Sequence, residues 1–239
     1  MNKNIVIGVW VIFVFGACLG QAQSNFVTID GDVTPVGDWD DEYCIDDVDG
    51  CDDEPGQRDS KYACVASNYA TVQPADTLYL RFDFDDTGFT GANTGDGCWL
   101  LDTDADLNVN AALCFTLSGT PATLDPADVQ LYSCNDSMAD RCAGSVALPA
   151  SSPVCLLDVD APDATSCNSG PDAAVECSVP IPDIGSLTSG TVLLGACTFP
   201  SEVPNSAPTD CVNDNGSPFI VDPFSGTSIP VELQSFRIE

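Results

Sequence analysis

Oxygen-bearing side chains at every second position mark the most informative stretch of the chain. Asp102, Asp104, Asp106 and Asn108 follow directly on an apolar run, residues 98–101. Carboxylate and amide oxygens spaced in this way can surround a hard cation such as Ca²⁺, and the carboxylates repel one another without one. The sequence therefore predicts a calcium site in this loop. The alternative is a polar loop whose Asp side chains accept hydrogen bonds from nearby backbone N–H groups.

The start of this loop has the spacing of an EF-hand calcium loop, but the remainder departs from it. Leu107 stands where the sharp turn of an EF-hand needs Gly, and Leu113 where a bidentate Glu would close the site. A looser calcium loop on a β-sheet scaffold is the better interpretation. Asp83 and Asp85 share one face of the preceding predicted strand, so we expect them to complete the coordination.

A second acidic run lies between Cys44 and Cys51 and supplies further predicted metal ligands, namely Asp46, Asp47 and Asp49. Such a run is either solvated or folded round Ca²⁺. Near-neighbour pairs such as Cys44–Cys51 and Cys134–Cys142 are candidate disulfides that would order the loops they close, although spacing in sequence does not fix the connectivity.

Two aromatic side chains, Trp39 and Tyr43, are the predicted ligand-binding residues. Trp39 lies in an acidic loop, where an exposed indole can stack on the C–H face of a sugar ring. The alternative for any lone Trp in a β-sheet protein is a place in the core. Trp99, inside an apolar run, is predicted to be a core residue.

The charge balance excludes several function classes. Six basic residues against 37 acidic ones give a net charge of −31, which argues against nucleic acid and anionic membranes as partners. The chain has no His, so a Ser-His-Asp triad and a His-ligated zinc or haem site are excluded. Catalysis by a pair of carboxylates would still be open to the chain, but no two acids stand out. We therefore expect a protein that is not an enzyme, with a carboxylate-dependent hydrolase as the lesser alternative.

The N-terminal residues have the pattern of an export signal. Residues 1–22 combine one early Lys, a long apolar run and a small-residue cleavage site, so the mature chain is expected to be residues 23–239, a single domain. A lipoprotein with Cys18 as the lipidated residue is the rival interpretation. The remaining cysteines of the thirteen form an even set, which indicates disulfides in an oxidising compartment. No later segment is apolar enough to predict a transmembrane span.

Short apolar segments separated by Gly, Pro, Asn, Asp and Ser recur along the chain, and long amphipathic helical patterns do not. This predicts an all-β, disulfide-rich, two-sheet antiparallel sandwich of the jelly-roll-like kind. At most a turn of helix is expected at 125–128 or 183–187. The predicted strands are 61–70, 77–84, 98–101, 111–117, 129–134, 154–159, 174–180, 191–199, 219–221 and 231–238.

Three segments carry a resemblance to a known group of proteins. Residues 29–32 with Trp39, residues 75–82 and residues 176–185 follow the order "IDG…DW", "D-x-LY", "E-x-x-(I/V)P". This order resembles the secreted DOMON-like β-sandwich modules, including family 9 carbohydrate-binding modules. The resemblance implies a jelly-roll-like sandwich, stabilisation by calcium and, as in some members, sugar binding between aromatic rings. Haem-binding members use Met and His ligands, and with Met138 as the only Met of the mature chain and no His, that branch is not expected.

These observations together favour a secreted, calcium-binding β-sandwich that acts as a binding or adhesion module. The expected partner is an extracellular glycan or another cell-surface or matrix component, with glycan as the favoured ligand class. The structural alternative is a matrix or filament-forming protein whose acidic faces are bridged by Ca²⁺. In that case self-assembly through the C-terminal strand, residues 231–238, is expected.

Overall fold

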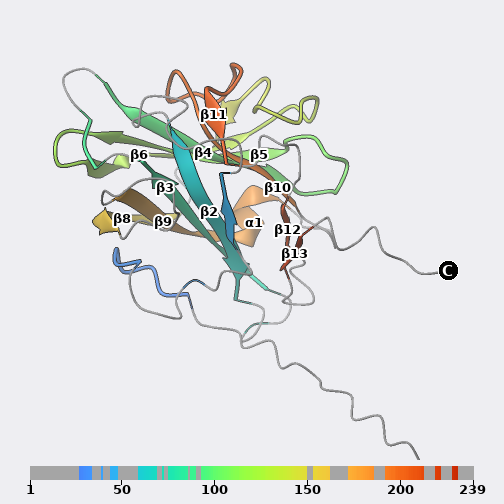
Figure 1. The fold of residues 1–239 in the computed structure, drawn as a ribbon. Helices are drawn as coiled ribbons and strands as arrows, with labels where there is room; N and C mark the ends of the chain where they lie inside the picture. Colours follow the sequence, from blue (N-terminus) through green and yellow to red (C-terminus); the bar gives the residue numbers. More distant parts are fainter. Residues whose placement is uncertain are drawn as a thin grey trace, which may run out of the picture.

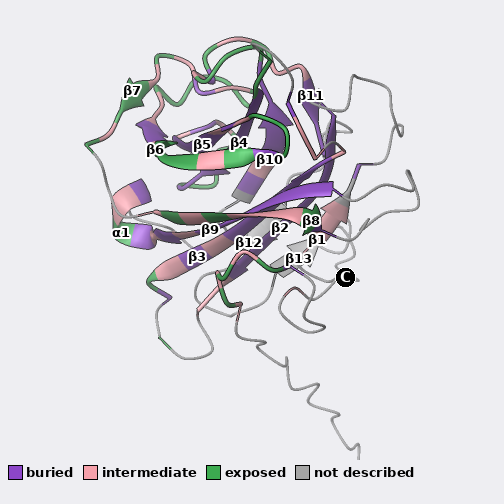
Figure 2. Cartoon of the chain, turned by 90° about the vertical axis from the view of Figure 1, so that its left-hand side faces the viewer, coloured by how far each residue is buried: buried purple, intermediate pink, exposed green. Residues whose placement is uncertain are grey.

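Two antiparallel sheets pack face to face in the computed structural model of the chain (Figures 1 and 2). The structure describes residues 27–33, 39, 44–47, 59–68, 72, 75–85, 87–89, 93–149, 153–161, 172–185, 192–212, 219–221 and 228–230. The two antiparallel sheets and the disulfides confirm the predicted all-β, disulfide-rich sandwich.

The smaller sheet has five strands. Their order across the sheet is β1 (Cys44–Asp46), β2 (Ser60–Ser67), β3 (Thr77–Phe84), β9 (Asp172–Pro180) and β8 (Val154–Ala161). The larger sheet runs in the order β13 (Ser228–Pro230), β12 (Phe219–Val221), β10 (Val192–Thr198), β4 (Gly95–Asp102), β5 (Ala111–Ser118), β6 (Thr123–Ser133) and β7 (Val146–Ala147). A short strand, β11 (Asp210–Cys211), pairs with β10 off this path.

Aromatic rings from both sheets meet in the core between them. Phe82 and Phe84 of β3 make edge-to-face contacts with Phe115 of β5, at centroid distances of 5.6 and 5.9 Å. Trp99 of β4 lies 5.1 Å from Phe115 and is fully buried, as predicted. Edge-to-face pairs of this kind add to the free energy of burial, so these rings fasten one sheet to the other.

The alternating pattern of β3 predicts one buried and one exposed face, and the structure shows that the second face is buried as well. Arg81 and Asp83 point away from the inter-sheet core, yet they are only 5% and 0% exposed. Val33 from the N-terminal segment packs against Ala174 of the neighbouring strand β9 on this outer face. An element remote in sequence therefore covers a face that the local pattern marks as solvated.

The other differences from the predicted elements are local. Residues 125–128 lie within β6 and not in a helical turn, at the irregularity in its register with β5 between the pairs Phe115–Val129 and Leu117–Leu124. The one described helix, α1 (Ile181–Ile184), is a single turn that partly matches the predicted 183–187. The predicted terminal strand 231–238 and the predicted leader 1–22 lie outside the described residues. Among the described residues, no helix is both long and apolar enough to span a bilayer.

Disulfides join directly opposite residues of neighbouring strands. Four of the five described bridges do so, namely Cys44–Cys64, Cys98–Cys114, Cys155–Cys177 and Cys197–Cys211. The fifth, Cys134–Cys142, closes a loop as predicted. The predicted Cys44–Cys51 bridge is wrong, because β1 pairs with β2 and places Cys44 opposite Cys64. So many bridges indicate that the protein matures in an oxidising environment.

Candidate metal-binding loops

The loop after β4 is wound round the carboxylate of Asp102. This side chain is fully buried, and its Oδ1 accepts hydrogen bonds from the backbone N–H groups of Asp104 (3.0 Å) and Ala105 (2.7 Å). Its Oδ2 accepts a third, from the N–H of Leu107 at 2.7 Å. Ala105 and Leu107 have positive φ values of 67° and 70°, which bend the backbone back towards the carboxylate. Asp102 thus accepts hydrogen bonds from the backbone N–H groups of its own loop, as the polar-loop alternative predicts.

Carboxylates from two loops nevertheless converge at this point. Oxygens of Asp102, Asp104 and Asp106 all lie within 4.8 Å of one another, and Asp104 and Asp106 are exposed. Asp136, from the loop between β6 and β7, joins them. Partial desolvation and then the negative charges of Asp106 and Asp102 raise the pKa of Asp136. Desolvation, followed by the charges of Asp106, Asp136 and Asp102, likewise raises the pKa of Asp104. We call these four residues the loop cluster.

The two loops are fastened to each other. The N–H of Val109 donates to the carbonyl oxygen of Met138 at 2.8 Å, and the N–H of Cys134 donates to that of Asn110 at 2.8 Å. Asp136 itself has a φ of 54° and lies inside the short loop that the Cys134–Cys142 disulfide closes. The position of Asp136 beside Asp106 is therefore fixed by covalent and backbone bonds. Asn108, also a predicted ligand, is turned towards Asp106 and donates from its backbone N–H to Asp106 Oδ1 at 2.8 Å.

The predicted ligands Asp83 and Asp85 do not join the loop cluster. Asp83 forms an ion pair with Arg81, whose Nε lies 2.7 Å from Asp83 Oδ1. Complete burial raises the pKa of Asp83, although the neighbouring guanidinium opposes the shift. Asp85 pairs with Lys61 at 3.3 Å, and Lys61 also contacts Asp172 at 3.1 Å. Both predicted ligands are thus paired with cationic side chains of the smaller sheet, and the expectation that they complete the calcium loop is wrong.

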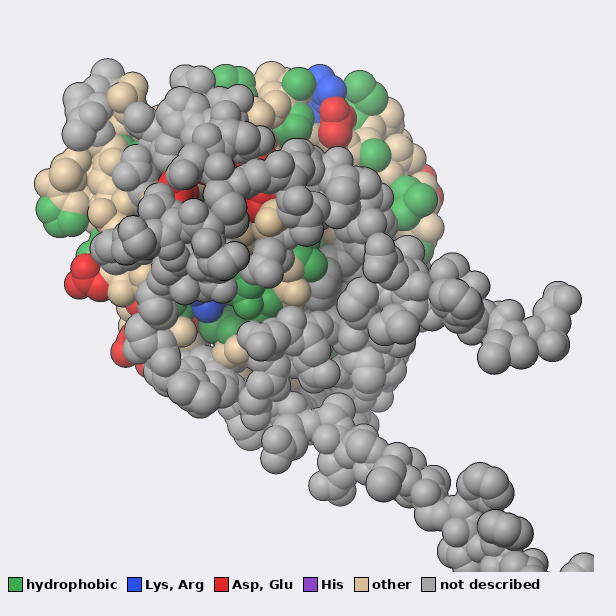
Figure 3. Space-filling model, viewed as in Figure 1, with side chains coloured by type: hydrophobic (Ala, Val, Ile, Leu, Met, Phe, Trp, Pro, Cys, Tyr) green, Lys and Arg blue, Asp and Glu red, His purple; other side chains and the backbone are tan. Residues whose placement is uncertain are grey.

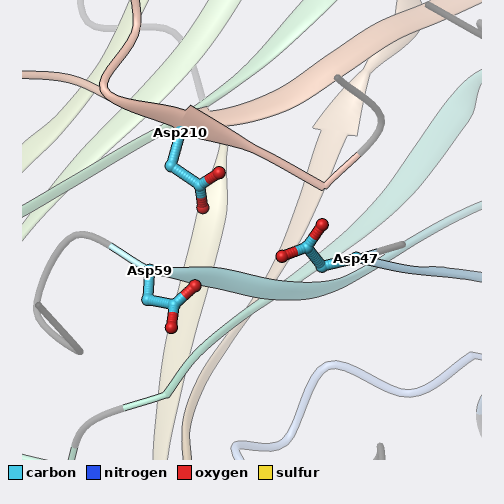
Figure 4. Close-up of side chains that lie close together, drawn as sticks. All are labelled: Asp47, Asp59 and Asp210. Carbon is cyan, nitrogen blue, oxygen red and sulfur yellow. The ribbon is translucent and has the colours of Figure 1, made fainter. Parts of the chain in front are cut away.

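A second group of carboxylates lies where β1, β2 and β11 meet. Oxygens of Asp47, Asp59 and Asp210 are within 4.8 Å of one another, and Figure 4 shows the three side chains turned towards a common space. Their exposed fractions are 9%, 3% and 8%. Asp210 Oδ2 accepts hydrogen bonds from both the backbone N–H and the hydroxyl of Ser60, each at 2.6 Å. Of the predicted ligands in the first acidic run, Asp47 belongs to this group, only the backbone of Asp46 is described, and Asp49 lies outside the described residues.

Trp39, predicted as an exposed stacking platform, is partly buried on the outer face of the smaller sheet. Its indole Nε1–H donates to Glu176 Oε1 at 2.8 Å, and the N–H of Gly31 donates to Glu176 Oε2 at 3.1 Å. Burial raises the pKa of Glu176, and the two hydrogen bonds oppose that shift. Close by, the N–H of Val33 donates to Asp158 Oδ2 at 3.2 Å. Trp39 therefore anchors the N-terminal segment, and its predicted companion Tyr43 lies outside the described residues.

Asp136, Asp59 and Asp210 are the members of these clusters that sequence reasoning missed. Asp136 and Asp59 are isolated acids, whereas Asp210 begins an oxygen-rich segment, residues 210–216, of a kind that alone is more typical of a turn than of a metal site. Only the fold brings the three to their partners. The short Cys134–Cys142 spacing was the one signal that the loop holding Asp136 is ordered. On the face shown in Figure 3, the described acidic side chains are scattered among apolar and neutral ones and few basic side chains are visible.

Comparison with known proteins adds no identification. No family model matches the chain, and neither a curated protein nor a solved structure does. The resemblance to DOMON-like modules accordingly stays an expectation.

Proposed function

We propose that this chain is an exported, calcium-binding β-sandwich that serves as a binding or adhesion module, with an extracellular glycan as its ligand. The observation that carries the proposal is the convergence of Asp102, Asp104, Asp106 and Asp136 from two fastened loops. Like charges held this close raise the free energy of the folded state, and a divalent cation would relieve the repulsion.

The donor set fits calcium by its chemistry. All the ligand atoms are hard oxygens, which suit Ca²⁺ and are poor ligands for softer metals that prefer sulfur or imidazole. Asp104, Asp106 and Asp136 would hold the ion, whereas Asp102 keeps its loop folded through its three backbone hydrogen bonds. Bound calcium would supply positive charge, which none of the four residues of the loop cluster carries.

Export is supported by the disulfides and by the leader-like pattern of residues 1–22. Bridges such as Cys98–Cys114 and Cys155–Cys177 would not persist in a reducing cytosol. The acidic balance of the whole chain favours a partner without strong negative charge, which a neutral glycan satisfies.

The proposed glycan contact centres on Trp39. Because its indole N–H is held by Glu176, the ring has a defined orientation, and a fixed ring costs less entropy when it stacks on a sugar. Two substitutions separate the two roles of this residue. Trp39→Phe keeps an aromatic ring and removes the hydrogen bond, whereas Trp39→Ala removes both.

A glycan array tests the proposal, with the protein in calcium and in excess EDTA. We expect binding to a defined set of glycans in calcium, weaker binding in EDTA, partial retention by Trp39→Phe and loss with Trp39→Ala. No glycan bound under either condition would overturn the adhesion proposal. Glycans bound equally by the wild type and Trp39→Ala would overturn the role of Trp39.

A further inference from the structure

Four cysteines form a continuous row across the larger sheet. Cys211 of β11 lies opposite Cys197 of β10, Cys197 lies opposite Cys98 of β4, and Cys98 lies opposite Cys114 of β5. The row contains two disulfides, Cys197–Cys211 and Cys98–Cys114. All four sulfur-bearing side chains belong to one apolar cluster on the outer face of this sheet.

The hydrogen-bond pattern of the sheet makes the spacing along this row alternate. The N–H of Val212 donates to the carbonyl oxygen of Ala196 at 3.0 Å, so these two residues form a hydrogen-bonded pair. The adjacent pair, Cys197 and Cys211, is therefore a closely spaced non-hydrogen-bonded pair. On the other side of β10, the N–H of Phe199 donates to the carbonyl oxygen of Asp96 at 2.9 Å. Hydrogen-bonded pairs recur at every second position, so the pair two residues away along β10 is hydrogen-bonded too. That pair is Cys197 with Cys98. The Cα–Cα distances agree, at 4.0 Å for Cys197–Cys211 and 4.1 Å for Cys98–Cys114.

The middle pair of the row is also within bridging distance. Hydrogen-bonded antiparallel pairs have Cα atoms about 5.5 Å apart. This value lies within the roughly 4.4–6.8 Å that separates the Cα atoms of most disulfides. Cys98 therefore has two cysteines within reach, Cys114 on one side and Cys197 on the other.

We propose that the row is a thiol–disulfide relay. A dithiol reductant first reduces Cys197–Cys211 and is itself oxidised to a disulfide. The thiolate of Cys197 then attacks the sulfur of Cys98, so that a Cys98–Cys197 bond forms while the Cys98–Cys114 bond breaks and Cys114 leaves as a thiolate. The second step neither gains nor loses electrons.

The strand order favours this second step. Disulfide exchange proceeds by attack of a thiolate on one sulfur of the disulfide while the other sulfur leaves. Since β4 lies between β10 and β5, Cys197 approaches Cys98 from the side opposite to Cys114. The entry point is Cys211, which is 9% exposed, whereas Cys98 and Cys197 are each 1% exposed. The result is that β11 is uncoupled from β10, and β10 becomes covalently joined to β4.

The other cross-strand bridges provide matched controls. Cys64 is bonded to Cys44 on one side and faces Arg81 on the other. Cys177 is bonded to Cys155 and faces Leu80 on its other side. A thiol freed at either position has no disulfide directly opposite it, so exchange of the same kind is not expected there.

The test uses the Cys211→Ser variant, in which Cys197 has lost its partner. The protein is alkylated with N-ethylmaleimide, digested with pepsin without reduction, and its linked peptides are identified by mass spectrometry. We expect the Cys98–Cys197 peptide to rise at least about tenfold over the untreated wild type, together with alkylated Cys114. In the Cys44→Ser control, alkylated Cys64 and otherwise unchanged bridges are expected. Alkylated Cys197 with Cys98–Cys114 intact in the Cys211→Ser variant would overturn the relay.

A second measurement serves if the Cys211→Ser variant does not fold. The wild type is treated with limiting dithiothreitol, samples are alkylated at intervals, and the same peptides are followed. Early appearance of the Cys98–Cys197 peptide with alkylated Cys114 and Cys211 supports the relay. Joint alkylation of Cys197 and Cys211, without that peptide at any time, contradicts it.

Discussion

The indole of Trp39 donates a hydrogen bond to the carboxylate of Glu176 at 2.8 Å, on the outer face of the smaller sheet. This contact joins the N-terminal segment to β9, and Gly31 adds a second hydrogen bond to the same carboxylate. The acidic and aromatic residues that a sequence pattern marks as exposed thus serve here to fasten one part of the chain to another.

The coupling between these two side chains can be measured with a double-mutant cycle. Trp39→Phe and Glu176→Gln are each expected to lower the free energy of unfolding by about 1–2 kcal/mol, because a partly buried hydrogen bond to a carboxylate is weakened or lost. The double variant should lose less than the sum of the two, as expected for residues in direct contact. Urea unfolding with the disulfides intact gives the three values. Strict additivity would show that the two side chains do not interact in solution.

Asp136→Asn should change stability in opposite directions with and without calcium. The raised pKa of Asp136 means that its protonated form is favoured by folding, so this contribution is full below the unfolded value of about 3.9 and is lost as pH rises through the folded pKa. In EDTA at pH 7 the neutral variant should therefore melt above the wild type, and the gap should close towards pH 4. With calcium at pH 7, the wild type should melt above the variant.

Differential scanning calorimetry in EDTA and in calcium, over this pH range, follows both effects. Asp140→Asn is the matched control, because Asp140 lies in the same loop but pairs with Arg141. A melting temperature for Asp136→Asn that stays below that of the wild type in EDTA at pH 7 would argue against repulsion within the loop cluster.

Lys61 should matter far more to stability than Arg141. Lys61 is 4% exposed and is shared by Asp85 and Asp172, so Lys61→Met leaves two buried carboxylates without this cation. We expect a loss of about 3–5 kcal/mol in the free energy of unfolding. Arg141→Met breaks an exposed ion pair and should cost at most about 1 kcal/mol. Equal losses in guanidinium titrations of the two variants would contradict this assignment.

Trp99→Phe should destabilise the sandwich more than Trp39→Phe does. Trp99 is fully buried between the sheets, and its Nε1–H donates to the carbonyl oxygen of Arg81 at 3.1 Å. The smaller ring leaves a cavity and an unmatched carbonyl, for which we expect a cost of roughly 2–4 kcal/mol. The same urea titration measures it, and a cost no larger than that of Trp39→Phe would show that the core repacks around Phe.

The sequence predicts the elements of this fold better than it predicts their partners. Alternating side chains predict β3 with its observed bounds, because every second side chain of this strand faces the inter-sheet core. The burial of Asp83 escapes prediction, since it depends on an N-terminal segment remote in sequence. The place of Asp136 in the loop cluster escapes prediction as well, because it depends on the packing of two separate loops. The partner of Cys44 depends on strand register, which spacing in the sequence does not fix.

Calcium titration by isothermal calorimetry tests the central claim most directly, with the chelator-treated wild type, Asp136→Asn and Asp140→Asn compared at pH 7. Saturable calcium binding is expected for the wild type and for Asp140→Asn, with a clear loss of affinity in Asp136→Asn. Calcium heats that are absent from the wild type, or unchanged in Asp136→Asn, would contradict the claim that the loop cluster holds the ion.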